Sequence, residues 1–482
     1  MLTSQKVLQG VALLHDRDEL QRIKHTWMKQ KCKVPLPFGM LGRLFREGEN
    51  INYPEFTCIR NYFGEMRAFY YAWVSFYTAW LCIPIIPGIL FMIYRYVALR
   101  LHSSEFARDA PFPFFAIFMC LWGSIAVSRW RRKQSEIATK WGLVSQLDNP
   151  IREKRVEFSG DYYIDTDSFH LKRYTHKKQR CLLLLLTVPV LIVLLSISIG
   201  IYLIIQEYKQ RYQGFVIQLS FGVLNGVGIT IINLIYQRIA IWSTERENYQ
   251  FLSSFERVLV FKSFLFKFIN SNMSLAYAAY FEANFDSLWY LVVGLLLARM
   301  ANLFLLGNIL PWMLFWLKRK RYFRMLRVLI EDRQLLNPST RKVHPSSRAK
   351  TSSFTSFEKD VLRRVVYDFN HNQLLSKTPI DSIEMDTNMN KAQLVIHRYA
   401  ELMVQFGYIT MYSAVCPVAS LLGLFAGMLE LKYGIIFDAK YLQRNVATKS
   451  TGIGTWMVIW EFLSILSILA TFLLSYIVFP LL

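Results

Sequence analysis

The stretch HRYAELMVQFGYITMYSAVCPVASLLGLFAGMLELKYGIIFDAKYL, residues 397–442, contains two hydrophobic segments separated at Pro417. Each segment is long enough to cross a bilayer as a helix. Each also carries a carboxylate near the end that we expect on the cytoplasmic side, Glu401 in the first and Glu430 in the second. A charge at bilayer depth costs roughly 3 kcal/mol or more. Two such acids in neighbouring membrane helices therefore indicate a functional site.

The composition of the whole chain is typical of a helical membrane protein. Its 482 residues are 53% hydrophobic, the mean hydropathy is +0.25, and several apolar runs reach the length of a membrane span. We therefore predict an all-α, polytopic membrane protein with about nine transmembrane helices. Their expected ranges are 69–97, 112–130, 181–206, 215–241, 258–282, 287–317, 396–415, 416–438 and 455–479.

The distribution of lysine and arginine predicts the orientation of these helices. Residues 129–180 contain 13 of them and residues 318–391 contain 16, whereas 98–111 and 207–214 contain two each. Because basic residues collect on the cytoplasmic side, we expect the N-terminus and the two basic loops there. The net charge of +22 is concentrated in such segments beside the apolar runs. This pattern favours membrane lipids as partners and gives no reason to expect nucleic acid.

The chain divides into four expected regions. Residues 1–57 form a cytosolic N-terminal segment and 58–317 hold the first six helices. Residues 318–395 form a basic, partly disordered cytoplasmic linker with short helices, and 396–482 hold the last three helices. The linker opens with KRKRYFRMLR, which predicts contact with lipid headgroups, either generally or as a specific phosphoinositide site.

No pattern in the sequence indicates covalent chemistry. The six cysteines show no CxxC or CxH spacing, which argues against a zinc site and against a disulfide framework. We find no Ser/His/Asp set and no phosphate-binding loop. We therefore expect a protein that is not an enzyme, with calcium as the only cofactor to consider.

Polar and small residues form a stripe on each of two central predicted helices, 215–241 and 258–282. At helical spacing the members of each stripe share one face, and a lipid-facing helix would not keep them. They either line a permeation path or act as polar contacts between packed helices. The residues are Gln218, Gly222, Asn225, Asn233 and Gln237 on the first helix, and Lys267, Asn270, Ser274 and Tyr277 on the second.

Several segments resemble the anoctamin family. They are IRNYFGEMRAFYYAWVSFYTAWL (59–81), FPFFAIFMCLWG (112–123), WRRKQSEIATKWG (130–142), FKSFLFKFINS (261–271) and AELMVQFGYITMYSAVCPVASLL (400–422). They occur in the same order as in that family, over about residues 59–479.

The resemblance implies a dimeric membrane protein that acts as a calcium-activated anion channel, a phospholipid scramblase, or both. It also implies a groove lined by the third to seventh helices, where Lys262 and Lys267 match basic positions on the fifth. Polar side chains and water in such a groove replace the hydration of an anion or a lipid headgroup. With the resemblance, we favour Gln218, Asn225, Asn233, Lys262, Lys267, Asn270 and Ser274 as groove-lining residues.

The calcium site of the family is only partly matched. Anoctamins supply an asparagine and a glutamate from helix six, two acids spaced i, i+3 from helix seven and two spaced i, i+4 from helix eight. Here Glu401 matches the second acid of helix seven, but Arg398 stands in place of the first. Glu430 matches the first acid of helix eight, and a displaced aspartate follows only at Asp438. Helix six has no acid, and Asn308 is its candidate oxygen donor.

A site with so few of the hard oxygen ligands that calcium requires predicts weak calcium binding at most. We expect Arg398 to act as a gating cation, which shares a helix face with Glu401 and lies close to Glu430. The alternative is a buried ion-pair network of Arg398, Glu401 and Glu430 that only holds the helices together.

Two functional hypotheses remain. The first is an anoctamin-like transport protein for anions, phospholipid or both, with a degraded calcium site. The second is a non-conducting membrane scaffold or tether whose working parts are the basic cytoplasmic segments. The given sequence ends directly after the ninth predicted helix, so we expect the family's tenth helix to be absent. Because that helix carries much of the dimer contact in anoctamins, a homodimer is left open.

Overall fold

The structure is a computed structural model, and its longest element is a helix of 35 residues. It describes chiefly residues 54–101, 112–143, 177–212, 214–282, 285–305, 391–413, 415–441 and 450–478, with isolated residues elsewhere. The expected N-terminal segment and the linker 318–395 therefore lie largely outside the described residues. The expected division into four regions stays a prediction.

The described chain is almost entirely helical. The helices are α3 (Pro54–Phe63), α4 (Glu65–Trp80), α5 (Cys82–Arg100), α7 (Phe112–Lys140), α9 (Lys177–Arg211), α10 (Phe215–Arg246), α11 (Leu252–Tyr280), α12 (Phe285–Phe304), α16 (Lys391–Met411), α17 (Ala419–Tyr441) and α18 (Thr455–Val478). Two short strands, β1 (Tyr162–Ile164) and β2 (Leu171–Arg173), pair antiparallel with Tyr162 opposite Arg173. Each of the nine predicted spans overlaps a described helix.

Among the described residues, five segments are long and apolar enough to cross a membrane, which confirms the prediction of a polytopic helical membrane protein. They are Glu65–Arg100 (α4 with α5), Pro113–Lys140, Thr187–Lys209, Phe215–Arg246 and Thr455–Leu474, and a shorter apolar helix covers Ser287–Asn302. Large apolar side chains on the outer faces of α5, α9, α10 and α18 are exposed, as expected for surfaces that face lipid.

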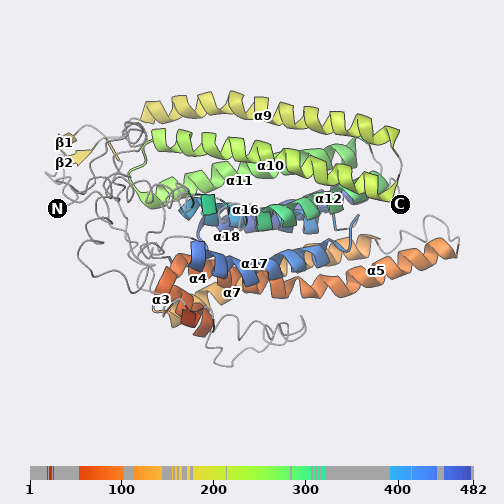
Figure 1. The fold of residues 1–482 in the computed structure, drawn as a ribbon, viewed down its shortest axis with the longest axis horizontal. Coiled ribbons are helices and arrows are strands. Elements are labelled where there is room, and N and C mark those ends of the chain that lie inside the picture. Colours follow the sequence, from red (N-terminus) through yellow and green to blue (C-terminus); the bar gives the residue numbers. More distant parts are fainter. Residues whose placement is uncertain are drawn as a thin grey trace, which may run out of the picture.

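The helices form two groups on either side of a central helix. In Figure 1, α9, α10 and α11 lie along one edge, α5, α7 and α17 lie along the other, and α16, α18 and α12 lie between them. Contacts of α16 with α4, α7, α11, α12, α17 and α18 show that it reaches both groups. The residues of α16 from Val395 onward are almost all buried.

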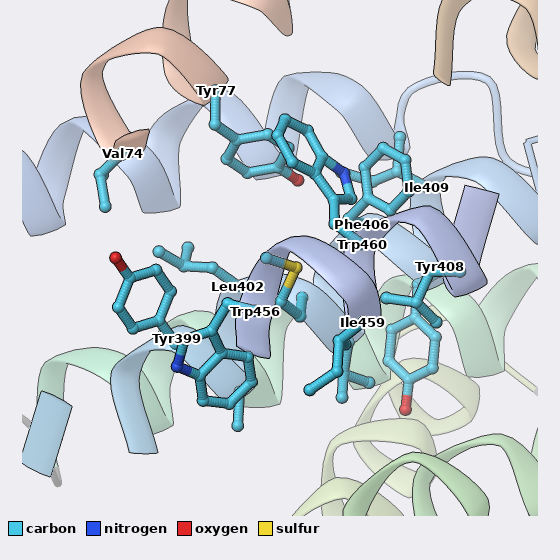
Figure 2. Packing of buried hydrophobic residues seen from close by; sticks show 14 of the residues in the cluster. Val74, Tyr77, Tyr399, Leu402, Phe406, Tyr408, Ile409, Trp456, Ile459 and Trp460 are labelled. Atoms are coloured by element: carbon cyan, nitrogen blue, oxygen red, sulfur yellow. The ribbon is translucent and has the colours of Figure 1, made fainter. Parts of the chain in front are cut away.

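Aromatic packing holds α16 against α4 and α18. Figure 2 shows Tyr399 of α16 beside Trp456 of α18, and Phe406 of α16 close to Tyr77 of α4 and Trp460 of α18. Tyr399 stacks on Trp456 with ring centroids 5.1 Å apart. Trp460 meets Phe406 edge to face at 5.8 Å. Since each large ring buries a large apolar area and such pairs add about 0.5–1.5 kcal/mol, this contact fixes the position of α16 and of the charges it carries.

Glycines bring α10 and α12 into close contact. A Cβ on Gly222 would lie 2.9 Å from the Tyr290 carbonyl oxygen, and a Cβ on Gly294 would lie 2.6 Å from the Gly222 Cα. A Cβ on Gly226 would collide with Ala298. This small-residue contact is the usual way for membrane helices to approach closely, and α10 packs more extensively on α12 than on any other described helix.

Candidate functional site

Buried charges gather in two clusters on either side of α16. The Glu401 cluster consists of Lys267 on α11, Arg299 on α12, and His397 and Glu401 on α16. The Asp438 cluster consists of Arg67 on α4, Arg398 on α16, and Glu430 and Asp438 on α17. All of these side chains except that of His397 are at most 8% exposed.

In the Glu401 cluster, two cations hold one carboxylate. Lys267 Nζ lies 2.5 Å from Glu401 Oε1, and Arg299 Nη1 lies 2.7 Å from Oε2. Arg299 also donates from Nη2 to the Ser271 hydroxyl at 2.5 Å and to the Tyr408 hydroxyl at 3.4 Å. Three helices, α11, α12 and α16, are thereby joined at one carboxylate. Removal of Glu401 would leave both buried cations without a counter-charge.

In the Asp438 cluster, two carboxylates are balanced by two guanidinium groups. Arg67 Nη1 lies 2.7 Å from Asp438 Oδ2, and Arg398 Nη1 lies 3.1 Å from Asp438 Oδ1 and 3.4 Å from Glu430 Oε1. Hydroxyl groups of α4 complete the cluster: Tyr71 donates to Asp438 Oδ2 and Tyr70 to Glu430 Oε1, each at 2.9 Å. The cluster joins α4, α16 and α17.

Gly434, four residues after Glu430, stands where the family has its second acid of helix eight. An added Cβ there would lie 2.9 Å from Glu430 Oε1 and 3.2 Å from the Tyr71 hydroxyl, so a larger residue would require these side chains to shift. Asp438 is one helical turn further on, where it reaches Arg67 and Arg398.

The structure separates residues that the sequence analysis grouped together. Arg398 lies close to Glu430, as expected, and also meets Asp438. Glu401 is held by Lys267 and Arg299 on the other side of α16. Asn308 lies outside the described residues. Within the described part of the chain, no three His, Cys, Asp or Glu side chains gather as a metal-binding group would. The calcium role of Glu401, Glu430, Asp438 and Asn308 stays a prediction.

The polar stripes of α10 and α11 meet each other. Asn225 Nδ2 donates to the Ser274 hydroxyl at 3.1 Å, and Asn270 Nδ2 donates to Asn233 Oδ1 at 2.8 Å. These two bonds hold α10 and α11 together, whichever role the stripes have. Gln218 is half-buried and donates instead to the backbone oxygen of Tyr212, before the start of α10.

Lys262 lies apart from the other expected lining residues. Its ammonium pairs with Glu247 at the end of α10 and lies 3.4 Å from the Ser243 hydroxyl. It is partly buried in this contact. Lys267, by contrast, belongs to the Glu401 cluster.

Two small cavities lie beside the Glu401 cluster and against the stripe of α10. The first, of about 20 Å³, is bounded by α10, α11 and α16, and Lys267, His397 and Glu401 line it. The second, of about 10 Å³, is bounded by α10, α12 and α16, and Arg299, Asn302 and Glu401 line it. Thr230 and Asn233 line both cavities. Polar groups therefore surround the only carboxylate in either lining.

At the opposite end of these helices, a second polar contact links α9 to the turn after α11. Glu282 accepts hydrogen bonds from the Tyr202 hydroxyl at 3.3 Å and from Gln206 Nε2 at 2.9 Å. Burial raises the pKa of the Glu282 carboxyl, although the Lys209 ammonium and the Tyr202 hydroxyl act in the other direction. This contact closes the far end of the α9, α10 and α11 group.

Comparison with known families places these clusters in context. Residues 59–479 match the family model described as "Anoctamin: Calcium-activated chloride channel". The chain belongs to the anoctamin family. Mouse anoctamin-8 is 26% identical over 305 residues, which cover 62% of this chain and 26% of that protein. Human anoctamin-10 is 22% identical over 479 residues, which cover 97% of this chain and 62% of that protein. The chain thus spans less than two thirds of the length of these curated relatives.

Within this anoctamin, the charges that the sequence analysis missed are Arg299 and Arg67. Arg299 stands in the apolar run LWYLVVGLLLARMANLF, where a lone cation calls for a buried partner. The sequence therefore indicated a buried partner for Arg299, but only acids and oxygen donors were expected to matter on this helix. Arg67 lies in the segment 59–81, which indicated family resemblance but gave no sign of a partner for this arginine. Its pairing with Asp438, 371 residues away, depends on how α4 packs against α17.

Proposed function

We propose that this anoctamin moves anions, phospholipid or both along a path beside α10, α11, α12 and α16, and that buried cations replace bound calcium in holding the gating helices. The observation that carries the proposal is the Glu401 cluster. Lys267 and Arg299 join three helices of the expected groove through one carboxylate, next to two small cavities.

A cation tethered to the protein can do part of the work of a metal ion. Calcium that bridges carboxylates neutralises groups that would otherwise repel each other. Here Arg398 and Arg67 neutralise Glu430 and Asp438, and Lys267 and Arg299 neutralise Glu401. Arg398 thus has the contacts that a gating cation needs. We therefore infer that activity depends little on calcium.

The experiment is transport by the purified protein in liposomes, with flipping of a fluorescent phospholipid and chloride efflux measured in parallel. We expect one or both fluxes to exceed those of protein-free vesicles, and to change little between calcium-free buffer and millimolar calcium. A steep rise with calcium that Glu401→Gln abolishes would show that the metal site is intact.

The double variant Asn270→Leu with Ser274→Leu tests the path itself. If these residues line it, leucines should reduce flux while thermal unfolding shows a folded protein, because apolar groups cannot replace the hydration of a charged substrate. Asn272→Leu is the control, since Asn272 bonds the Phe268 carbonyl oxygen on its own helix. Equal fluxes in the unmodified protein, the double variant and the control would mean that Asn270 and Ser274 only pack the helices together.

The close contact of α10 with α12 favours a second candidate, a non-conducting scaffold. At Gly222, Gly226 and Gly294 these two helices approach so closely that an added Cβ would lie within 3 Å of the other helix. Transport would require this contact to open, whereas a scaffold would keep it closed. Absence of both fluxes, with and without calcium, in a folded protein would support the scaffold.

A further inference from the structure

The Glu401 cluster carries an excess of positive charge. Lys267 and Arg299 both pair with Glu401, and among the described residues no other carboxylate lies within salt-bridge distance of either cation. Both cations are buried, with side chains 8% and 7% exposed. A buried charge without a counter-charge costs several kcal/mol. The Asp438 cluster shows no such excess, because two guanidinium groups there meet two carboxylates.

The same cluster contains buried hydrogen-bond donors without acceptors. Arg299 Nε has no hydrogen-bond partner among the described residues. His397 Nδ1 lies 3.5 Å from Lys267 Nζ, and since an ammonium group can only donate, Nδ1 must accept. The ring hydrogen then lies on His397 Nε2, which makes no hydrogen bond in the described part of the chain and has Glu401 Oε1 3.8 Å away. Buried donors that make no hydrogen bond are destabilising, because they have lost their bonds to water.

The two cavities give room for a ligand beside these groups. About 10–15 Å³ is needed to hold a water molecule, and the larger cavity, of about 20 Å³, is lined by Lys267 and His397. Arg299 lines the adjoining cavity. Asn233, which lines both cavities, supplies a further donor through its side-chain amide. The space fits one small ion and excludes a lipid headgroup.

We propose that a small inorganic anion of halide size binds beside Lys267, Arg299 and His397, and that this resident anion balances the charge of the Glu401 cluster. The anion would stabilise the junction of α11, α12 and α16 and would remain bound there. Binding of this anion does not depend on transport activity. The proposal therefore applies whether the protein conducts ions, scrambles lipid or only tethers membranes. Its charge is the reverse of that of a calcium site, which makes the two readily distinguishable.

The test is thermal unfolding of the full-length protein in detergent, in sodium chloride against sodium gluconate at equal ionic strength. Gluconate is too large for the cavities, so we expect chloride to raise the unfolding temperature in a saturable manner, and bromide to do the same. No difference between chloride and gluconate would overturn the proposal.

Two substitutions in the cluster should weaken the chloride effect and a third should strengthen it. Arg299→Gln and Lys267→Gln each remove the excess charge and should weaken chloride binding. We expect the chloride concentration that gives half of the effect on the unfolding temperature to rise roughly tenfold or more, which is the usual value of a hydrogen bond to a charged group. Glu401→Gln increases the excess and should strengthen the effect. A cation site would instead be lost in Glu401→Gln.

Two controls keep the test decisive. Arg131→Gln removes an exposed cation that pairs with Glu461 on the protein surface, and it should leave the chloride effect unchanged. If Arg299→Gln does not fold, Arg299→Lys keeps the charge and should retain the effect, while Lys267→Gln still removes it. A chloride effect of the same size in every variant would mean surface screening and would also overturn the proposal.

Discussion

Arg398 shows how one residue can decide what a membrane site is able to bind. Its guanidinium lies within 3.4 Å of two carboxylates that would otherwise be free to share a metal ion. Tyr70 donates to Glu430 Oε1 and Tyr71 to Asp438 Oδ2, so each carboxylate has one oxygen held by a tyrosine as well as by a guanidinium group. Glu430 Oε2 has no hydrogen-bond partner among the described residues.

This arrangement predicts a large loss of stability in Arg398→Gln. Asp438 would keep Arg67, but Glu430 would lose the cation that it pairs with. Removal of one partner from a buried ion pair typically costs about 3–5 kcal/mol. The control is Arg131→Gln, because Arg131 pairs with Glu461 at a side-chain exposure of 64% and such surface pairs contribute about 0–1 kcal/mol. Urea or thermal unfolding in detergent measures both. Equal losses would mean that the buried guanidinium is not needed for charge balance.

The identity of these residues was visible in the sequence, but their partners were not. Glu401 and Glu430 stood out because ionisable residues in membrane helices are costly. Arg398 and Asp438 stood out because they depart from the calcium-ligand positions of the anoctamin family. Spacing suggested that Arg398 would face Glu401, since they are three residues apart. The packing of α16 between two helix groups turns one toward α17 and the other toward α11 and α12. Helical spacing could not predict this separation.

At the scale of elements, the contact between α10 and α12 depends on glycine. Gly222 belonged to a predicted polar stripe, yet it packs against the backbone of α12 near Gly294. Periodicity correctly placed it on the buried face of its helix. The partner helix could not be predicted, because small residues fit a groove lining and a tight helix crossing equally well.

Gly226→Ala tests how tightly this contact is packed. An added methyl group would collide with Ala298, and overpacking of a close contact typically costs about 1–3 kcal/mol. Gly200→Ala on α9 is the matched control, since no atom lies within 4 Å of its added Cβ. We expect that control to change stability by less than about 1 kcal/mol. If Gly226→Ala were as stable as the control in thermal unfolding, the two helices would not be in contact in the folded protein.

At the scale of the whole molecule, both charge clusters belong to helices that meet α16, and α16 links the two groups of helices. Loss of either cluster would therefore affect the position of one group relative to the other. The order of the helices also follows the predicted alternation across the membrane. In Figure 1, α7 ends and α9 begins on the same side as β1 and β2, and α9 ends on the opposite side, where α10 begins.

The basic segment after α7 therefore predicts which side is cytoplasmic. Residues 129–180 contain 13 lysines and arginines, and the short turn 207–214 between α9 and α10 contains two. Because basic loops remain in the cytoplasm, the turn near Tyr212 should face the lumen or the outside, and Gly142 at the end of α7 should face the cytoplasm. The matched pair is one insertion with an N-glycosylation acceptor in a flexible spacer, placed after Tyr212 or after Gly142. The acceptor after Tyr212 should be glycosylated in cells and the one after Gly142 should not, whichever membrane holds the protein. Glycosylation at Gly142 alone would reverse the orientation and place the linker 318–391 outside the cytoplasm.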